Sequence, residues 1–237
     1  MISVIMPAYN EEETIEEAVV RTVEVLETIN LEWEIVVVDD GSTDSTFDKV
    51  NKLENCYGNI KALTYKQNKG KGFALKYGFE HSSGDPIVFL DSDLDIDPSA
   101  ISQFLKILER DGADIVVGSK RHPMSKVEYP LKRRMLSDVY CLMIKVLFNL
   151  GVKDTQVGLK VFRRKVLEEV MPRILVKRYA FDVELLANAV RRGYKVVEAP
   201  INLNFKFNSH VDLREIYRMF LDTFAIAYRM YIRRYYD

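Results

Sequence analysis

Short apolar segments alternate with helical periodicity over the first 119 residues, and this alternation limits the fold more than any other feature. Buried parallel strands are predicted at five runs, ISVIMP, WEIVVVDD, IKALTY, PIVFLD and ADIVVGS. Between the first two runs, apolar residues recur every three or four positions from Ile15 to Ile29, as in an amphipathic helix. We therefore expect an α/β fold with a mostly parallel central sheet, helices on both faces and ligands beyond the carboxyl ends of the strands.

The second half of the chain departs from this alternation. A basic connection (119–134) leads into an apolar helix over about 132–150, a strand at GLKVF, a helix around FDVELLANAV and a strand near KVVEAP. From Leu213 onward, aromatic residues recur every three or four positions with arginines between them, which predicts a C-terminal amphipathic helix. We expect one domain over residues 1–210 and this aromatic and basic helix over 211–237.

The aromatic stripe of the tail has two interpretations. Aromatic and basic side chains favour a membrane interface, whereas a stripe at helical spacing also packs on its own domain or on a second copy of the chain. The sequence leaves a peripheral membrane contact, internal packing and a homo-oligomer open. The aromatic positions are Tyr217, Phe220, Phe224, Tyr228, Tyr231 and Tyr235.

Charge and cysteine content narrow the class of protein. A formal net charge of −1 gives no nucleic-acid footprint. Cys56 and Cys141 provide neither a disulfide framework nor a metal spacing, and the N-terminus has neither a basic nor an apolar leader region. The longest apolar stretch, 139–152, is too short for a membrane span and contains Lys145. We expect a cytoplasmic protein, peripheral on the cytoplasmic face of the membrane.

Four aspartates follow the fourth predicted strand at alternate positions, in VFLDSDLDID (88–97). Alternate residues of an extended chain point the same way, and such clustered negative charge is unfavourable unless a cation offsets it. An EF-hand is excluded because its sixth and twelfth positions hold Ile96 and Ser102. Asp97, directly before a proline, is expected to begin the next helix. Asp91, Asp93 and Asp95 remain as candidate metal ligands.

Known phosphate-binding motifs are absent from the sequence. NKGKGFALK (68–76) has glycines and lysines before a helix but lacks the spacing of a P-loop. Lys69, Lys71 and the helix N-terminus could face an anion, or the lysines could simply be exposed to solvent. PAYNEEE has no glycine, which argues against a dinucleotide fingerprint. A nucleotide must therefore be held in another way.

Five motifs in this order resemble the family 2 glycosyltransferases of the GT-A fold: SVIMPAYNEEETI, EIVVVDDGSTDST, NKGKGFALKYGF, VFLDSDLDIDP and VGSKR. KDTQVGLKVFRRKVLE, followed by FDVELLANAVRRGYKVVEAPI, resembles the polyprenyl-phosphate sugar synthases, particularly the dolichyl-phosphate glucose synthases. The resemblance covers roughly residues 2–205. It implies a GT-A, Rossmann-like fold and a nucleotide-sugar donor.

The resemblance also implies roles for individual residues. The first loop packs around the nucleoside, Asp40 accepts a hydrogen bond from the base, and Val38 lies beside it. Asp91 and Asp93 form the family's D-x-D motif, which holds Mg²⁺ or Mn²⁺ against the diphosphate. Asp95 is expected as a further metal ligand. The expected nucleotide-sugar contacts are Pro7, Ala8, Tyr9, Glu11, Val38, Asp40, Lys71, Asp91, Ser92 and Asp93.

The acceptor side of the site is assigned by the same resemblance. Lys120, Arg133 and Lys206 match the basic positions that hold the lipid phosphate in these synthases. Asp154 and Asp182 match acids near the sugar pocket, and with Asp93 they are the candidate catalytic residues. The sequence does not separate the roles of these acids.

The expected reaction is a metal-dependent transfer with inversion. A phosphate monoester is largely ionised at neutral pH, so it can attack the sugar without a side chain to deprotonate it. We predict transfer of glucose from UDP-glucose to dolichyl or polyprenyl phosphate. The alternatives are mannose from GDP-mannose, transfer to a saccharide hydroxyl, and a catalytically silent nucleotide-binding module.

Overall fold

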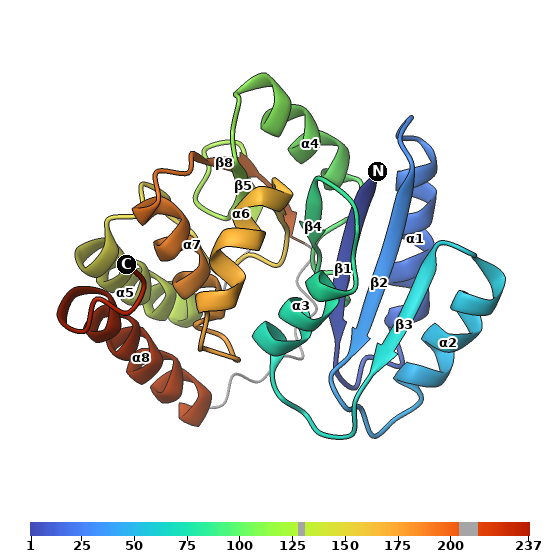
Figure 1. The fold of residues 1–237 in the computed structure, drawn as a ribbon, viewed down its shortest axis with the longest axis horizontal. Helices are drawn as coiled ribbons and strands as arrows, with labels where there is room; N and C mark the ends of the chain where they lie inside the picture. The colour runs from blue at the N-terminus through green and yellow to red at the C-terminus, as the bar shows by residue number, and fades with distance from the viewer. Residues whose placement is uncertain (128–130, 204–212) are drawn as a thin grey trace.

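The fold is built on one seven-stranded sheet covered by helices (Figure 1). The computed structural model describes residues 1–127, 131–203 and 213–237. The strand order is β3-β2-β1-β4-β7-β5-β8, and β7 alone runs antiparallel to its neighbours in this sheet. Its strands are β1 (Ile2–Ala8), β2 (Trp33–Asp39), β3 (Ile60–Thr64), β4 (Ile87–Phe89), β5 (Ile115–Ser119), β7 (Lys160–Phe162) and β8 (Val196–Pro200). The mostly parallel α/β architecture predicted from the sequence is confirmed.

Helices cover both faces of the sheet, as the alternation predicted. They are α1 (Ile15–Glu27), α2 (Thr46–Cys56), α3 (Lys71–Glu80), α4 (Ala100–Arg110), α5 (Leu131–Phe148), α6 (Arg164–Val170), α7 (Phe181–Arg191) and α8 (Leu213–Ala227). A 3-10 turn (Met171–Arg173) and a π turn (Tyr228–Ile232) complete them, and a small second sheet pairs β6 (Lys126–Val127) with β9 (Asn202–Leu203).

Alternate residues of the central strands point into two separate hydrophobic cores, because successive side chains of a strand face opposite sides. Val4 and Val37 pack with α1, α2 and α4 on one face. Ile5 and Val36 pack with α3, α5, α6, α7 and α8 on the other. Burial on both faces explains why β1 and β2 are continuous apolar runs rather than alternating ones.

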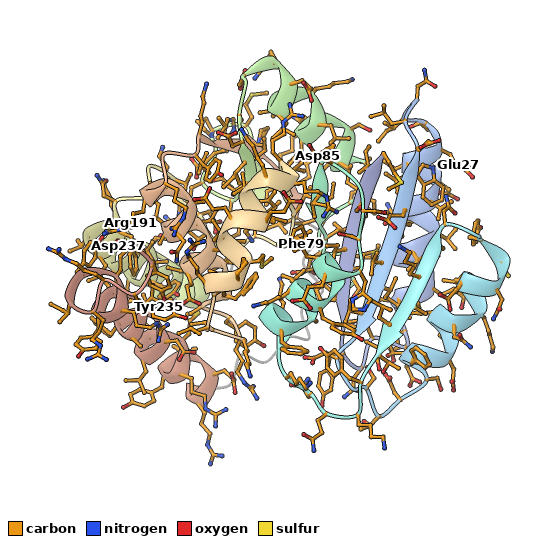
Figure 2. All side chains as sticks on the ribbon, in the orientation of Figure 1. Glu27, Phe79, Asp85, Arg191, Tyr235 and Asp237 are labelled. Atoms are coloured by element: carbon orange, nitrogen blue, oxygen red, sulfur yellow. The ribbon has the colours of Figure 1, made fainter. Side chains whose placement is uncertain are left out.

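The C-terminal helix is amphipathic, as predicted, and its buried side belongs to the main core. Ile226, Met230 and Tyr236 are buried in the same cluster as α5 and α7. The Tyr140 and Thr223 hydroxyls are 2.9 Å apart, which ties α5 to α8. Arg191 Nε donates to Asp237 Oδ1 over 2.9 Å, so the last residue is held against α7 (Figure 2). The internal packing left open by the sequence is therefore present.

Across the described ranges of the chain, each helix is too short or too polar to cross a lipid bilayer.

Glu34 is a buried carboxylate at the start of β2, and its hydrogen bonds should make the stability of the fold sensitive to acid. It accepts hydrogen bonds from Ser3 Oγ over 2.6 Å, Lys61 Nζ over 2.7 Å and Ser83 N over 2.6 Å. Burial raises its pKa, but these donors outweigh burial and lower the pKa of Glu34 to about 2. Because the folded pKa is the lower one, this stabilisation is complete above the unfolded pKa near 4.5 and is lost as pH falls toward 2.

We expect Glu34→Gln to lower the free energy of unfolding at pH 7 by about 3 kcal/mol. The variant should also flatten the dependence of stability on pH between about 5 and 2. Urea unfolding at several pH values measures both effects. Equal pH slopes for the variant and the wild type would contradict this account.

Candidate active site

A cleft of about 440 Å³ lies at the carboxyl ends of β1, β2 and β4. Most of the predicted metal and nucleotide residues lie there, because these three strands are parallel and end at the same edge of the sheet. The predicted residues that line it are Pro7, Ala8, Tyr9, Glu11, Asp40, Lys71, Asp91, Ser92 and Asp93.

The loops after β1 and β2 interlock and form one wall of the cleft. Asn10 N donates to Ser42 Oγ over 2.9 Å, and Asn10 Oδ1 accepts from Thr43 N over 2.9 Å. Glu11 N donates to Thr46 Oγ1 over 2.8 Å, at the start of α2. These contacts fix the loop that carries Tyr9, whose ring is exposed at the cleft.

Asp40 shapes the approach to α3. Its buried carboxylate accepts hydrogen bonds from Tyr65 Oη and Lys69 N, each over 2.7 Å, and from Gly70 N over 2.8 Å. The carboxylate thus fixes the turn that places Lys71 at the first position of α3. Its contact with a nucleotide base remains a prediction. Val38 does not reach the cleft, because it is fully buried in the core beneath α3.

Asp91 and Asp93 concentrate negative charge at the base of the cleft. Lys71 Nζ lies 2.6 Å from Asp91 Oδ1 and 2.7 Å from Asp91 Oδ2. Burial, reinforced by the charges of Asp91 and Asp95, raises the pKa of Asp93 to about 7. Asp93 Oδ1 accepts a hydrogen bond from Asp95 N over 3.0 Å. The negative charge of the carboxylates in the site thus exceeds the positive charge of the groups around them.

The donor set suits a hard divalent cation. Carboxylate oxygens are the ligands that Mg²⁺ and Mn²⁺ prefer, and Mg²⁺ in phosphate-transfer sites takes one or two carboxylates together with substrate phosphates and water. Within residues 1–127, 131–203 and 213–237, no group of three or more acidic, histidine or cysteine side chains is placed to hold a metal. The structure therefore does not gather Asp95 with Asp91 and Asp93, and its role as a third ligand stays a prediction.

Asp154 lies outside the cleft lining and is paired with the predicted acceptor residue Lys120. Asp154 is buried, and its Oδ2 lies 3.6 Å from Lys120 Nζ and accepts from Lys120 N over 3.2 Å. The Arg133 side chain and Lys206, the other two predicted phosphate contacts, lie outside the described residues. The acceptor assignments remain predictions.

Asp182 is part of a buried ion pair that sequence reasoning missed. Lys160, in the middle of the sheet, is 1% exposed, and its Nζ lies 2.8 Å from Asp182 Oδ1 and donates to Val157 O over 2.5 Å. Asp182 does not line the cleft. Burial opposes the charged form of Lys71, but the nearby charge of Asp91, with a smaller contribution from Asp182, raises the pKa of Lys71. This geometry favours a positioning role for Asp182 over contact with the reacting atoms. A lysine inside the apolar run GLKVF was the available signal.

The far lip of the cleft comes from residues that the sequence did not single out. Arg178 and Tyr179 precede α7, and Glu215 lies in the first turn of α8. Arg178 Nη1 is 3.5 Å from Glu215 Oε1, which links the two segments. These positions are distant in sequence from the motifs and carry no local signal. Asn68 and Gly70 complete the lining beside α3.

The model of Glycosyl transferase family 2 matches residues 3–171 of the chain. The chain belongs to this family. It is therefore a glycosyltransferase. The prediction that the protein is an enzyme of this class is confirmed.

Curated relatives of this family 2 glycosyltransferase match most of its length. It is 34% identical to the dolichyl-phosphate beta-glucosyltransferase ALG5D of Trichomonas vaginalis, over 98% of this chain and 75% of that protein. It is 31% identical to a dolichyl-phosphate beta-glucosyltransferase of Dictyostelium discoideum, over 85% of this chain and 65% of that protein. The glycosyltransferase AglD of Haloferax volcanii is 31% identical over 90% of this chain, which spans only 34% of that relative.

Solved structures confirm the GT-A fold of this family 2 enzyme. Glucosyl-3-phosphoglycerate synthase from Mycobacterium tuberculosis, crystallised with UDP, superposes with a TM-score of 0.74 at 20% identity. The match covers 96% of this chain and 79% of that one. The same synthase with Mn²⁺, UDP and phosphoglyceric acid gives a TM-score of 0.74 at 22% identity, over 96% and 77% of the two chains.

Gly158 of this glycosyltransferase packs closely against the side chain of Asp91. Gly158 lies two positions before β7 begins, and Asp91 N donates to Gly158 O over 3.2 Å. A Cβ at this position would lie 2.3 Å from Asp91 Oδ2. We expect Gly158→Ala to displace the Asp91 carboxylate and to lower kcat about 10²-fold, because small misplacements in an active site are costly.

Gly58→Ala is the matched control, since a Cβ there meets nothing within 4 Å. It should leave kcat within about twofold of wild type. Steady-state transfer assays and thermal melts of both variants separate a site effect from a folding effect. Full activity in Gly158→Ala would contradict the assigned place of Asp91.

Proposed function

We propose that this enzyme transfers glucose, with inversion, from UDP-glucose to dolichyl phosphate or another polyprenyl phosphate. The observation that carries the proposal is the single cleft that joins Asp91 and Asp93 to the first-loop residues Tyr9 and Glu11. The choice of donor and acceptor is supported by the relatives named dolichyl-phosphate beta-glucosyltransferase. The synthase that shares the fold was crystallised with UDP-glucose and Mn²⁺.

The chain's own residues divide the work of holding the donor. The loop that carries Tyr9 and Glu11 holds the nucleoside. Ser92, after β4, donates its hydroxyl to Pro7 O over 3.0 Å and so supports the end of β1 where that loop begins. Asp91 and Asp93 would hold Mg²⁺ or Mn²⁺. Such a cation, when bound, neutralises the negative charge that develops on the departing diphosphate.

The acceptor supplies its own nucleophile. A phosphate monoester has a second pKa of about 6, so its oxygen is largely deprotonated at pH 7. That oxygen forms a bond to the anomeric carbon while the bond from this carbon to the β-phosphate oxygen breaks and UDP leaves. Lys120, Arg133 and Lys206 would hold the phosphate in line for this attack. In the free enzyme Asp154 holds Lys120 in place.

Parallel incubations test the proposal. The full chain is supplied with Mg²⁺ or Mn²⁺, polyprenyl phosphate, and labelled UDP-glucose or labelled GDP-mannose, and label is counted in the organic extract. We expect label from UDP-glucose alone. Label from GDP-mannose alone would keep the transfer but replace the donor. No lipid label from either donor would refute the lipid phosphate acceptor.

We also propose that the outward sides of α5 and α8 contact the membrane that contains such an acceptor. Both helices expose large apolar side chains with basic residues beside them, a composition that favours a lipid interface. The exposed basic residues are Lys145 in α5, Arg214 and Arg218 in α8, and Arg233 and Arg234 directly after the π turn. The exposed apolar residues are Val139, Leu142 and Val146 in α5, Tyr217, Leu221 and Phe224 in α8, and Tyr228, Tyr231 and Ile232 in the π turn that continues α8.

We expect the wild type to sediment with vesicles containing anionic phospholipid. The double variant that combines Val146→Glu and Phe224→Glu should weaken this binding by about tenfold or more, because each change adds a charge that must be desolvated. Leu31→Glu is the control, since Leu31 is about as exposed as Phe224 but precedes β2. Equal loss in both variants, or no vesicle binding by the wild type, would contradict a specific membrane face.

A further inference from the structure

The ammonium group of Lys71 forms an ion pair with Asp91, one of the two carboxylates that would bind the metal. Lys71 Nζ approaches both oxygens of Asp91, at 2.6 Å and 2.7 Å. Both side chains are largely buried, with 26% and 30% of their surfaces exposed. The contact is therefore a two-sided ion pair within the cleft rather than a surface pair.

The position of Lys71 is fixed by the packing of α3. Gly72 N donates to Lys177 O over 2.8 Å, and a Cβ on Gly72 would lie 2.6 Å from the Phe181 ring. Gly70 has a φ of +97° and also packs against Lys177. The start of α3 thus rests on the segment before α7, and the lysine side chain extends from a rigid base toward Asp91.

The ammonium group and a divalent cation compete for Asp91. The ammonium group contacts both carboxylate oxygens, and a divalent cation bound to the same carboxylate would lie close enough for the two positive charges to repel each other strongly. Displacing Lys71 without a new partner leaves a largely buried positive charge unpaired, which is unfavourable. A nucleoside diphosphate offers such a partner, because its phosphate oxygens accept hydrogen bonds from lysine.

We propose that Lys71 is a built-in counter-ion that competes with the divalent cation for Asp91 and moves to the donor's diphosphate when the donor binds. The free enzyme then binds metal weakly, and metal and nucleoside diphosphate strengthen each other's binding. This coupling rests on the proposed use of a metal-bound nucleotide sugar. It assigns Lys71 a role in the order of binding as well as in nucleotide contact.

A titration of the full chain with Mn²⁺, with and without UDP, tests the proposal without requiring turnover. The EPR signal of free Mn²⁺ gives the dissociation constant in each case. In the wild type, UDP should tighten Mn²⁺ binding about 10- to 100-fold. Lys71→Met should bind Mn²⁺ alone about tenfold more tightly than wild type, and the effect of UDP should shrink by a similar factor, because the coupling is reciprocal. Asp93→Asn should lose this binding and so identifies the site.

Two control variants separate charge from position. Lys71→Arg keeps the competing cation and should bind Mn²⁺ within about threefold of wild type. Lys69→Met removes a neighbouring lysine whose Nζ lies 4.3 Å from the centre of the Phe73 ring, away from Asp91, and should also behave as wild type. Thermal melts confirm folding, and Lys71→Gln replaces the methionine variant if that variant does not fold.

The outcomes distinguish this inference from the proposed function. If UDP tightens Mn²⁺ binding in the wild type but Lys71→Met binds Mn²⁺ alone no more tightly, the counter-ion role is wrong and the metal-bound donor stands. If the wild type binds no Mn²⁺ even with UDP, the proposed metal site and the counter-ion role both fail. Tighter binding by Lys71→Met, with wild-type behaviour in both controls, supports the inference.

Discussion

Asp93→Asn is expected to lower kcat for sugar transfer by about 10³-fold or more while the protein remains folded. Removing one group that stabilises developing negative charge in a transition state typically costs about 10²- to 10³-fold, and the loss of a bound divalent cation removes two positive charges at once. Asp93 is also the carboxyl whose pKa is raised to about 7 by burial and by Asp91, so a cation bound there relieves a real charge imbalance. Initial rates at saturating donor measure the effect.

Asp97→Asn is the matched control for this change. Asp97 lies in the same run of alternating acids, but its carboxylate accepts a hydrogen bond from Ser99 N over 2.8 Å at the start of α4 and pairs with Arg21. It should alter kcat by no more than about threefold, because its role is structural. If Asp93→Asn retained activity similar to that of Asp97→Asn, the D-x-D carboxylates would not be the metal site.

Glu184→Gln is expected to cause the largest loss of stability, about 3–5 kcal/mol. Glu184 is fully buried in α7. Its Oε1 accepts from Tyr236 Oη and from Arg229 Nη2, the latter over 3.0 Å, and its Oε2 accepts from Val176 N over 2.7 Å. An amide at this position would leave the guanidinium group of Arg229 without its counter-charge and would set one N–H against a donor.

Glu109→Gln provides the comparison for Glu184, since Glu109 pairs with Arg163 at the surface over 2.7 Å. An exposed pair of this kind contributes no more than about 1 kcal/mol. Urea unfolding of both variants gives the two free energies. A loss in Glu184→Gln as small as that in Glu109→Gln would mean that the C-terminal segment is not fastened to α7 through this carboxylate.

The sheet, and the position of Asp91 and Asp93 beside the loop after β1, were predictable because their signals are local. Buried parallel strands form continuous apolar runs, and the topology of a parallel sheet places the residues after β1, β2 and β4 at one edge. The role of Asp97 at the helix entrance was also visible, because capping chemistry depends on neighbouring residues. These predictions required no knowledge of distant contacts.

Features that depend on distant contacts were not predictable. Val38 was expected beside the base, but it faces α3 within the core, since the side-chain direction in β2 is fixed by packing. The buried partner of Asp182 is Lys160, on a strand 22 positions earlier in the chain. Arg178 and Glu215 form the lip because α8 packs beside the segment before α7, and no local pattern indicates this contact.

The configuration of the glycosyl phosphate product tests the central claim most directly. A single in-line attack by the acceptor phosphate on an α-linked nucleotide sugar must invert the anomeric carbon. We predict that proton NMR of the purified lipid product shows a β-linked glucosyl phosphate. An α-linked product would contradict direct in-line attack by the acceptor phosphate.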